Sequence, residues 1–247
     1  MPVSQLEQLG FHPTGGSVHL SRTMMFDELV LIMDRLARNP SGDLKKAVLE
    51  ENLLGKPTST TRQITFSKLS RLYGLDVRVP LFRFFFELWG KDKTSRALLA
   101  SLVAQARDPV FASSWGLISK LSPGSSLAAE TIEVFLSDTY GDHLRLSTRR
   151  SASRSLRSSW TQCGYLTGTT DRVRTRPTPT PECLALALWM AKAEGRQDQR
   201  LLESLWVERL ELDMSSKEDM LQSARQRGYV EYKNAGGIME LKVVLDV

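Results

Sequence analysis

Cysteine and histidine are scarce in this sequence of 247 residues, and their scarcity excludes several kinds of site. The two cysteines, Cys163 and Cys183, cannot build a framework of disulfides and lack the Cys-x-x-Cys spacing of zinc sites. The three histidines, His12, His19 and His143, do not have the spacing of metal ligands either. We therefore expect no metal, no cofactor and a reduced, cytoplasmic compartment.

Long apolar runs are missing as well. The most apolar stretch, residues 81–89, contains Arg83 and Glu87 and is far shorter than the ~20 residues of a membrane-spanning helix. The first residues lack the basic and then apolar pattern of a secretory signal peptide. The sequence therefore predicts neither secretion nor a membrane span.

Catalytic motifs are also missing. There is no glycine-rich phosphate loop and no serine in the context of a nucleophile elbow. Two carboxylate pairs, Glu50 with Glu51 and Asp138 with Asp142, have no lysine or third acid at the spacing of a magnesium-dependent nuclease. We expect a protein without enzymatic activity.

The positive charge is concentrated in one segment. The chain has a formal net charge of +5, from 33 basic and 28 acidic residues. Residues 145–176 contain eight arginines and one acid, Asp171, so this segment carries +7 and the other 215 residues sum to −2. A basic segment on a nearly neutral body is typical of a surface that attracts a polyanion. A solvated, arginine-biased surface is the alternative.

Residues 23–140 show helical periodicity throughout. Apolar residues recur at spacings of three and four, as in Phe26, Leu29, Met33 and Leu36, and again in Ile132, Phe135, Leu136 and Tyr140. Breaks rich in proline, glycine, asparagine and aspartate separate about six or seven such segments. We predict a mainly α protein whose residues 1–140 form a helical bundle.

The basic segment has the pattern of a helix followed by a hairpin. We expect a helix that Ser147 caps and Gly164 ends, with one apolar face made of Ala152, Leu156, Trp160 and Cys163. The arginines of this helix lie about 130° from that face. In the strand that follows, arginines alternate with other residues and should share one side. Residues 141–180 therefore resemble the recognition helix and wing of a winged helix-turn-helix, which could pack with the bundle.

A second unit of the same kind is predicted over residues 181–247. Ser215 and Glu218 suggest a capping box, Gly228 ends the helix, and a hairpin follows with its turn at residues 234–237. A shift of 64 residues aligns Ser159, Gln162, Gly164, Tyr165 and Leu166 with Ser223, Gln226, Gly228, Tyr229 and Val230. The second copy has balanced charge, so we expect it to pack or to bind protein.

We interpret the basic unit as a surface for duplex DNA, bound mainly through phosphates. The candidate residues are Ser147, Arg149, Arg150, Arg154, Arg157, Arg172, Arg174 and Arg176. The helix face offers no Asn or Gln for base reading. RNA, an acidic protein surface and an exposed helix without a ligand are the alternatives.

A secondary set of candidates opens the helix that runs to Tyr73. Hydroxyl groups at a helix N-terminus can hold a phosphate, although capping is their commoner role. The secondary candidates are Thr60, Thr61, Arg62 and, farther along the helix, Lys68.

The chain resembles a known family in residues 48–56, in the segment 58–62 and in the helix to Leu72 and Tyr73. These residues are similar to the N-terminal signature of the BrxA-like family of BREX phage-defence systems. The similarity continues more loosely through Arg107, Asp108 and Pro109 to residues 164–166, and covers about half of the chain. This resemblance implies a small, mostly helical, non-enzymatic DNA-binding accessory protein that works beside other phage-defence proteins. A scaffold within a defence complex and a transcription regulator are the alternatives.

Overall fold

The computed structural model describes residues 2–235 and 238–244 of the chain. Over these residues it is mainly helical, with two antiparallel hairpins of two strands each, which confirms the predicted fold class. The first part contains α1 (Val3–Gln8), α2 (Phe26–Arg38), α3 (Leu44–Leu49), α4 (Ser59–Tyr73), α5 (Pro80–Trp89) and α6 (Arg96–Arg107). The middle contains α7 (Pro109–Ile118), α8 (Ala129–Tyr140), α9 (Leu146–Gln162), β1 (Leu166–Thr167) and β2 (Val173–Arg174). The last part contains α10 (Pro181–Ala193), α11 (Gln199–Leu202), α12 (Leu205–Glu208), α13 (Met214–Gln226), β3 (Val230–Ala235) and β4 (Ile238–Val243).

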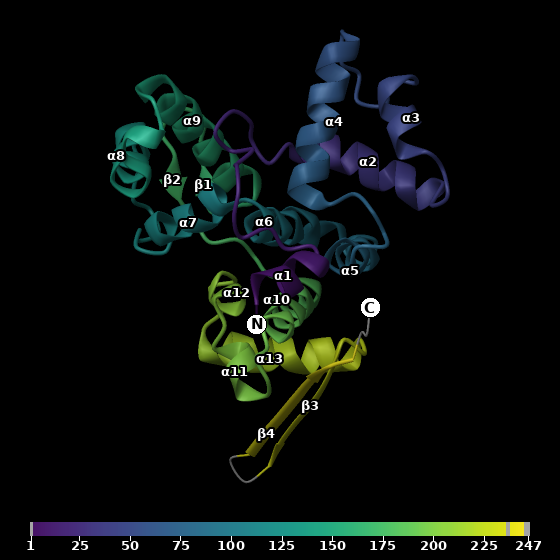
Figure 1. The fold of residues 1–247 in the computed structure, drawn as a ribbon. Coiled ribbons are helices and arrows are strands. Elements are labelled where there is room, and N and C mark those ends of the chain that lie inside the picture. Colours follow the sequence, from purple (N-terminus) through teal and green to yellow (C-terminus); the bar gives the residue numbers. More distant parts are fainter. Residues whose placement is uncertain (1, 236–237, 245–247) are drawn as a thin grey trace.

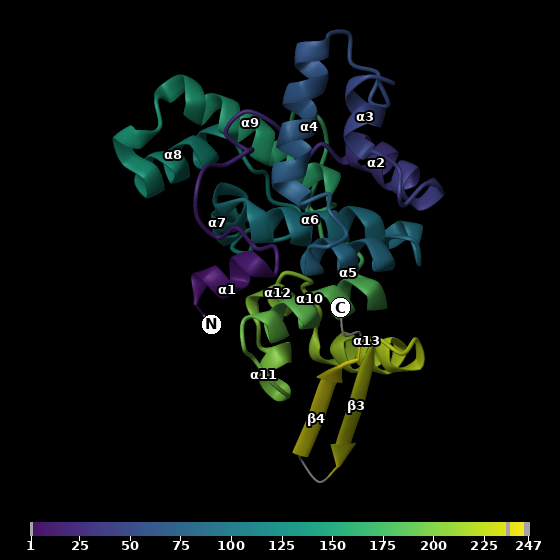
Figure 2. The ribbon, with the colours of Figure 1, turned by 45° about the vertical axis from the view of Figure 1, so that its right-hand side comes forward.

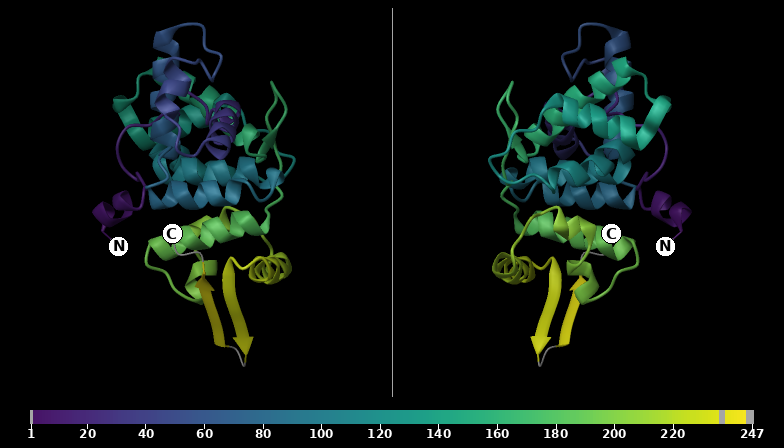
Figure 3. Two further views of the ribbon diagram at one scale, coloured as in Figure 1. Left: turned by 90° about the vertical axis from the view of Figure 1, so that its right-hand side faces the viewer. Right: turned by 90° about the vertical axis from the view of Figure 1, so that its left-hand side faces the viewer.

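Two lobes stand on a central helical layer (Figure 1). One lobe contains α8, α9 and the β1–β2 hairpin, the other contains α2, α3 and α4, and α5 and α6 lie beneath them. The helices α10–α13 and the β3–β4 hairpin lie on the opposite side of this layer (Figure 3), where α10 contacts α5 and α6. The buried apolar side chains of all three parts form one connected core.

The helix α5 lies at the centre of the molecule, as its sequence predicts. Its buried residues are Leu81, Phe82, Phe84, Phe85, Leu88 and Trp89. Phe84 packs on Trp189 of α10, with ring centroids 5.6 Å apart, and Phe85 packs edge-on against Trp89 at 5.4 Å. This aromatic layer joins the upper lobes to the last part of the chain.

The predicted N-terminal caps can be compared with the observed starts of α4, α9 and α13. The side chain of Thr58 caps α4 by accepting the Thr61 N–H at 3.1 Å, so the capping role of this segment is confirmed. The predicted cap by Ser147 is wrong, because α9 already begins at Leu146, and its N-cap residue Arg145 forms no side-chain cap. The predicted box at Ser215 is also wrong, because the Asp213 carboxylate accepts the Ser216 N–H at 2.8 Å.

The last part repeats a local geometry of the middle part at a shift of 64 residues. Gly164 and Gly228 both end a helix with positive φ, +86° and +74°. The next residue, Tyr165 or Tyr229, then donates its N–H to the carbonyl five residues earlier, at 2.9 Å in each case. Each tyrosine leads into a hairpin, β1–β2 or β3–β4.

The middle part has the connectivity of a winged helix-turn-helix: α7, a short extended segment, α8, α9 and a hairpin. The extended segment pairs with β2 through a bridge from Ser126 to Val173, and α8 packs on α9. Residues 141–180 therefore pack with helices that precede the predicted boundary. The last part has a similar order, α10, α11, α12, α13 and the β3–β4 hairpin, with the short helix α11 as an additional element.

The second hairpin has a longer ladder than the sequence suggested. Asn234 and Ala235, predicted in the turn, belong to β3 and pair with Met239 and Ile238. The other two residues of that turn, Gly236 and Gly237, lie outside the described residues, as does Leu245.

Candidate nucleic-acid interface

The helix α9 buries one face and exposes the other. Its predicted apolar residues Ala152, Leu156, Trp160 and Cys163 are all buried. Trp160 donates its indole N–H to Ser114 Oγ at 3.0 Å, and its ring packs against Phe111 of α7, with centroids 4.5 Å apart. These contacts fix the rotation of α9 and so determine which side chains face solvent.

Three arginines follow the exposed face of α9. The side chain of Arg150 is 63% exposed, with its Nε 3.9 Å from a carboxylate oxygen of Glu133. Arg154 is exposed and has no hydrogen-bond or ion-pair partner within the described part of the chain. Arg157 is half-buried, one turn farther on. The spacing of i, i+4 and i+7 places the three guanidinium groups on one stripe.

The stripe continues into the β1–β2 hairpin. Arg157 Nη2 donates to the carbonyl of Thr170, beyond the end of β1, at 2.8 Å. Arg172 donates to the Gly168 carbonyl of the same turn. Partial burial and the neighbouring charge of Arg157 lower the pKa of Arg172. The guanidinium groups of Arg157 and Arg172 thus lie close enough to influence each other, which concentrates positive potential where the helix meets the wing.

Arg174 does not belong to this surface, and its assignment as a DNA contact is corrected here. Its side chain is 1% exposed and forms an ion pair with Glu211. It also donates to the carbonyls of Thr175 and, at 3.0 Å, Ile118. The face of β2 that carries Arg174 meets the end of α7 and Glu211, so the predicted alternation of three solvent-facing arginines fails at its middle position.

The other primary candidates lie around the edges of the stripe. Arg149 is half-buried and donates to Ser137 Oγ of α8. Ser147 is exposed in the first turn of α9. Arg176 is exposed and lines a cavity of about 510 Å³ together with Asp213 and Lys217. The pKa of Asp213 is lowered mainly by hydrogen bonds from Ser216 and Ser215, and to a smaller extent by the charge of Arg176.

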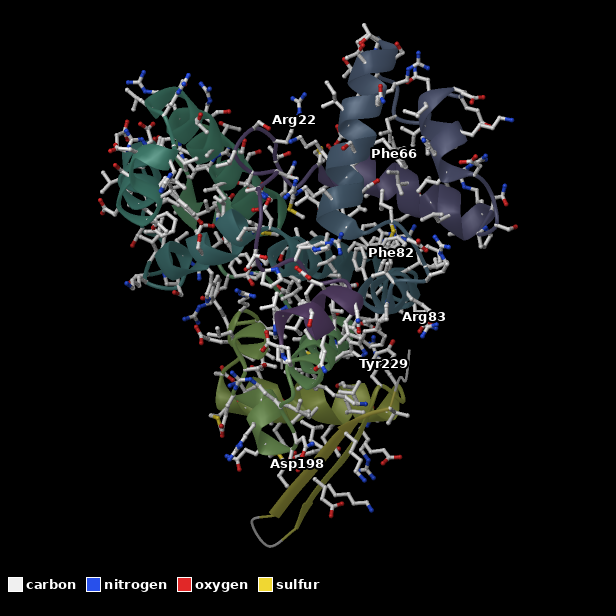
Figure 4. All side chains as sticks on the ribbon, in the orientation of Figure 1. Arg22, Phe66, Phe82, Arg83, Asp198 and Tyr229 are labelled. Carbon is white, nitrogen blue, oxygen red and sulfur yellow. The ribbon has the colours of Figure 1, made fainter. Side chains whose placement is uncertain are left out.

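One secondary candidate meets α9 across the gap between the two lobes. A cavity of about 280 Å³ is lined by Ser155 of α9, Thr61 of α4 and the loop residue Arg22. Figure 4 shows Arg22 between the two lobes, and Figure 2 shows α9 and α4 on either side of this gap. Lys56 also lines the cavity but is paired with Glu28 at 2.7 Å.

The remaining secondary candidates contribute less to this cavity. Thr60 is exposed in the first turn of α4, and Lys68 is half-buried farther along. Arg62 Nη1 donates to the carbonyl of Leu49 at 2.8 Å, so this side chain holds α3 against α4. Arg22 was missed by sequence reasoning, because its partners in the cavity come from helices far away in the chain.

A buried Ser-His-Asp arrangement holds the loop that carries Arg22. His19 Nδ1 lies 3.0 Å from Asp108 Oδ2, and His19 Nε2 lies 3.1 Å from Ser159 Oγ of α9. All three residues are buried, and Ser159 Oγ accepts the Met24 N–H and donates to the Ser155 carbonyl. With its serine enclosed and occupied in this way, the arrangement clamps the loop onto α9.

Burial opposes ionisation of Asp108, but the interaction with His19 and hydrogen bonds from Ser17 and the Phe111 N–H outweigh it. The pKa of Asp108 therefore lies well below its usual range. The same carboxylate caps α7, so one ionised group joins the loop of residues 17–24 to α7.

In residues 2–235 and 238–244, no three His, Cys, Asp or Glu side chains are grouped as metal ligands would be. Within the same residues, no helix combines the length and apolar character needed to cross a bilayer. Comparison with protein-family models and with curated protein sequences finds no match to the chain.

Proposed function

We propose that this protein is a non-enzymatic DNA-binding accessory protein of a bacterial phage-defence system and acts in the cytoplasm. The observation that supports DNA binding is the stripe of Arg150, Arg154, Arg157 and Arg172 on the outer face of a helix and its wing. We call these four residues the arginine stripe. It has one weak acidic contact, at Glu133, within the described residues.

The shape of this unit suits a DNA duplex. An α-helix fits the major groove, which is about 12 Å wide, and a wing beside it reaches the adjacent phosphate backbone. Arginine offers a planar fork of donors that can bind phosphate oxygens in pairs. Because the exposed face carries arginine and serine rather than Asn or Gln, it favours phosphate contacts over base reading.

The gap between the lobes extends the proposed surface. The side chain of Arg22 is exposed there and has no hydrogen-bond or ion-pair partner among the described residues. The hydroxyl groups of Thr61 and Ser155 line the same cavity. A duplex lying along the stripe could therefore place a phosphate near Arg22.

A second candidate function is that of a protein adaptor in a defence complex. Two apolar side chains of the last part are strongly exposed: Met214 at 81% and Leu205 at 54%. They stand at the starts of α13 and α12, in the unit with balanced charge. This observation favours a protein contact there, and the two functions are compatible in one chain.

The link to phage defence rests on the resemblance of residues 44–166 to the BrxA-like family. It predicts that the protein co-purifies with other phage-defence proteins encoded beside it. A transcription regulator would instead protect one operator in a footprinting experiment, whereas phosphate-based binding gives similar affinity for unrelated duplexes.

Fluorescence anisotropy with a short random-sequence DNA duplex tests the proposed function. Duplex RNA of the same sequence and polyglutamate serve as competitors, because they represent the other polyanions that arginines attract. We expect duplex DNA to displace the labelled duplex at a lower concentration than either competitor. Stronger competition by polyglutamate would favour the adaptor function, and equal competition by RNA would remove the preference for DNA.

A further inference from the structure

The outer edge of the second strand differs between the two hairpins: it has backbone partners at β2, but none among the described residues at β4. In the first hairpin, the outer edge of β2 is covered by the extended residues 124–127. The Arg174 N–H donates to the Ser125 carbonyl at 2.8 Å, the Arg174 carbonyl accepts the Gly124 N–H at 2.8 Å, and the Arg172 carbonyl accepts the Leu127 N–H at 2.8 Å. This segment thus acts as a third strand.

The repeat shows which residues of the second hairpin are equivalent. Thr175 donates its N–H to the Tyr165 carbonyl at 2.9 Å, and Val244 donates its N–H to the Tyr229 carbonyl at 3.1 Å. Counting back from these two residues makes Val243 equivalent to Arg174, and Leu241 equivalent to Arg172.

The backbone groups of Leu241 and Val243 point away from β3. Val243 pairs with Val230, and Leu241 with Tyr232. In an antiparallel ladder, hydrogen-bonded pairs alternate with pairs that are not hydrogen-bonded. Because Val244 and Tyr229 form a hydrogen-bonded pair, the pairs Val243–Val230 and Leu241–Tyr232 are of the second kind. Within the described part of the chain, the outward N–H and C=O groups of Leu241 and Val243 have no hydrogen-bond partner.

A groove lies along this edge, between β4 and the residues that follow α10. A cavity of about 560 Å³ is lined by residues 241–244 on one side and by Arg196, Asp198 and Leu201, from the end of α10 to α11, on the other. Figure 3 shows β4 as the strand of the hairpin on the side of α11. The groove has an apolar floor in Leu201, Leu241 and Val243, all buried, and charged rims.

We propose that this groove accepts an extended segment of a partner protein, which adds to β4 as a third strand. The inference goes beyond the proposed DNA binding and does not depend on it. The first hairpin shows what the occupant should look like: small residues followed by an apolar one, as in Gly124, Ser125, Ser126 and the buried Leu127. Backbone pairing supplies affinity and the apolar residue supplies register.

A single strand fits this place better than the hairpin of a second copy. In the first hairpin a four-residue segment, about 13 Å long when extended, is enough to cover the edge. A second copy could offer its own β4 only together with β3, and the end of α10 and α11 close the groove on the far side.

Amide hydrogen exchange of the full chain, measured residue by residue by NMR, tests the open edge first. We expect the N–H groups of Leu241 and Val243 to exchange at least tenfold faster than those of Lys242 and Glu240, which pair with β3. The Arg174 N–H, whose edge is covered, is the matched control and should be slow. Slow exchange of the Val243 N–H in the free protein would overturn the proposal, because the edge would already be covered.

Peptide binding tests the occupant. The probe is a phage-displayed library of random nine-residue peptides, and selected peptides are then titrated into the labelled full chain. We expect them to slow exchange at Leu241 and Val243, and to bind the Val243→Pro variant at least tenfold more weakly than Val243→Thr, which keeps the N–H. Peptides that bind both variants equally, or whose shifts fall outside the groove, would overturn the proposal. Slow exchange of the Lys242 and Glu240 N–H groups, which pair with β3, shows in each variant that the hairpin is retained.

Discussion

Arg174 of β2 forms a buried ion pair with Glu211, which follows α12, and so connects the first hairpin to the last part of the chain. The same junction contains the Tyr165 hydroxyl, which donates to the Arg209 carbonyl, and the Trp115 indole N–H, which donates to Glu208 at 3.3 Å. Arg174 is therefore an arginine that stabilises the fold, in contrast to the residues of the arginine stripe on α9 and the hairpin.

Replacing Arg174 should affect stability and leave DNA binding by the folded protein unchanged. We expect Arg174→Ala to lower the free energy of unfolding by about 3 kcal/mol, since removal of one partner leaves Glu211 unpaired in a largely buried place. Urea unfolding measures this change. Arg154→Ala, at an exposed position, is the control and should change stability by less than about 0.5 kcal/mol. An Arg174→Ala protein of normal stability but weakened duplex binding would contradict the assignment.

The two remaining arginines of the wing should behave differently. Arg172 belongs to the arginine stripe and lies beside Arg157, whereas Arg176 lies beside Asp213. We expect Arg172→Ala to reduce the slope of log affinity against log salt by about 0.9, the value for one phosphate contact. Arg176→Ala should leave the slope unchanged. If both variants reduced the salt slope equally, the DNA would contact the whole segment from Arg172 to Arg176 rather than only the tip of the wing.

Asp108 should make the protein sensitive to acid. Its pKa is lowered in the folded state, so its ionised form contributes stability above the usual pKa of about 4, and this contribution is lost as the pH falls toward the folded-state value. We expect Asp108→Asn to destabilise the protein by about 2 kcal/mol at pH 7, and to flatten the fall in stability between about pH 5 and pH 3. Urea unfolding across this range measures both effects, with exposed Asp171→Asn as the control. A variant with the wild-type pH profile would show that the clamp does not depend on this carboxylate.

The two cysteines should be unreactive in the folded protein. Burial raises the pKa of Cys163 to about 12 and that of Cys183 to about 11, so the thiolate form is rare at pH 8. A chromogenic disulfide reagent should react with neither thiol in buffer and with both in urea. Rapid reaction of one thiol in buffer would indicate that the core around it opens.

The elements that sequence reasoning located best are those set by local chemistry. The apolar face of α9, the central helix α5 and the positive φ of Gly164 and Gly228 all follow from spacing and residue type. The start of α9 was misplaced because this helix begins at Leu146 without a side-chain cap, so no capping residue marks its start in the sequence.

The candidate site was only partly visible in the sequence for a physical reason. Alternation along a strand shows which residues share a side, but not whether that side meets solvent or another segment. The Arg174 side chain is buried because its side of β2 meets the Ile118 carbonyl and Glu211. The gap that contains Arg22 is formed by three segments that are distant in sequence, and no local pattern marks it.

Salt dependence of duplex binding tests the central claim most directly. The variant carries Arg150→Ala, Arg154→Ala and Arg157→Ala, and the matched control carries Arg38→Ala, Arg78→Ala and Arg200→Ala, which remove the same charge from exposed positions on other elements. We predict that the first variant flattens the slope of log affinity against log salt by about 2.7, while the control keeps the wild-type slope and both remain folded. A wild-type slope in the first variant, or equal flattening in both, would contradict binding by the arginine stripe.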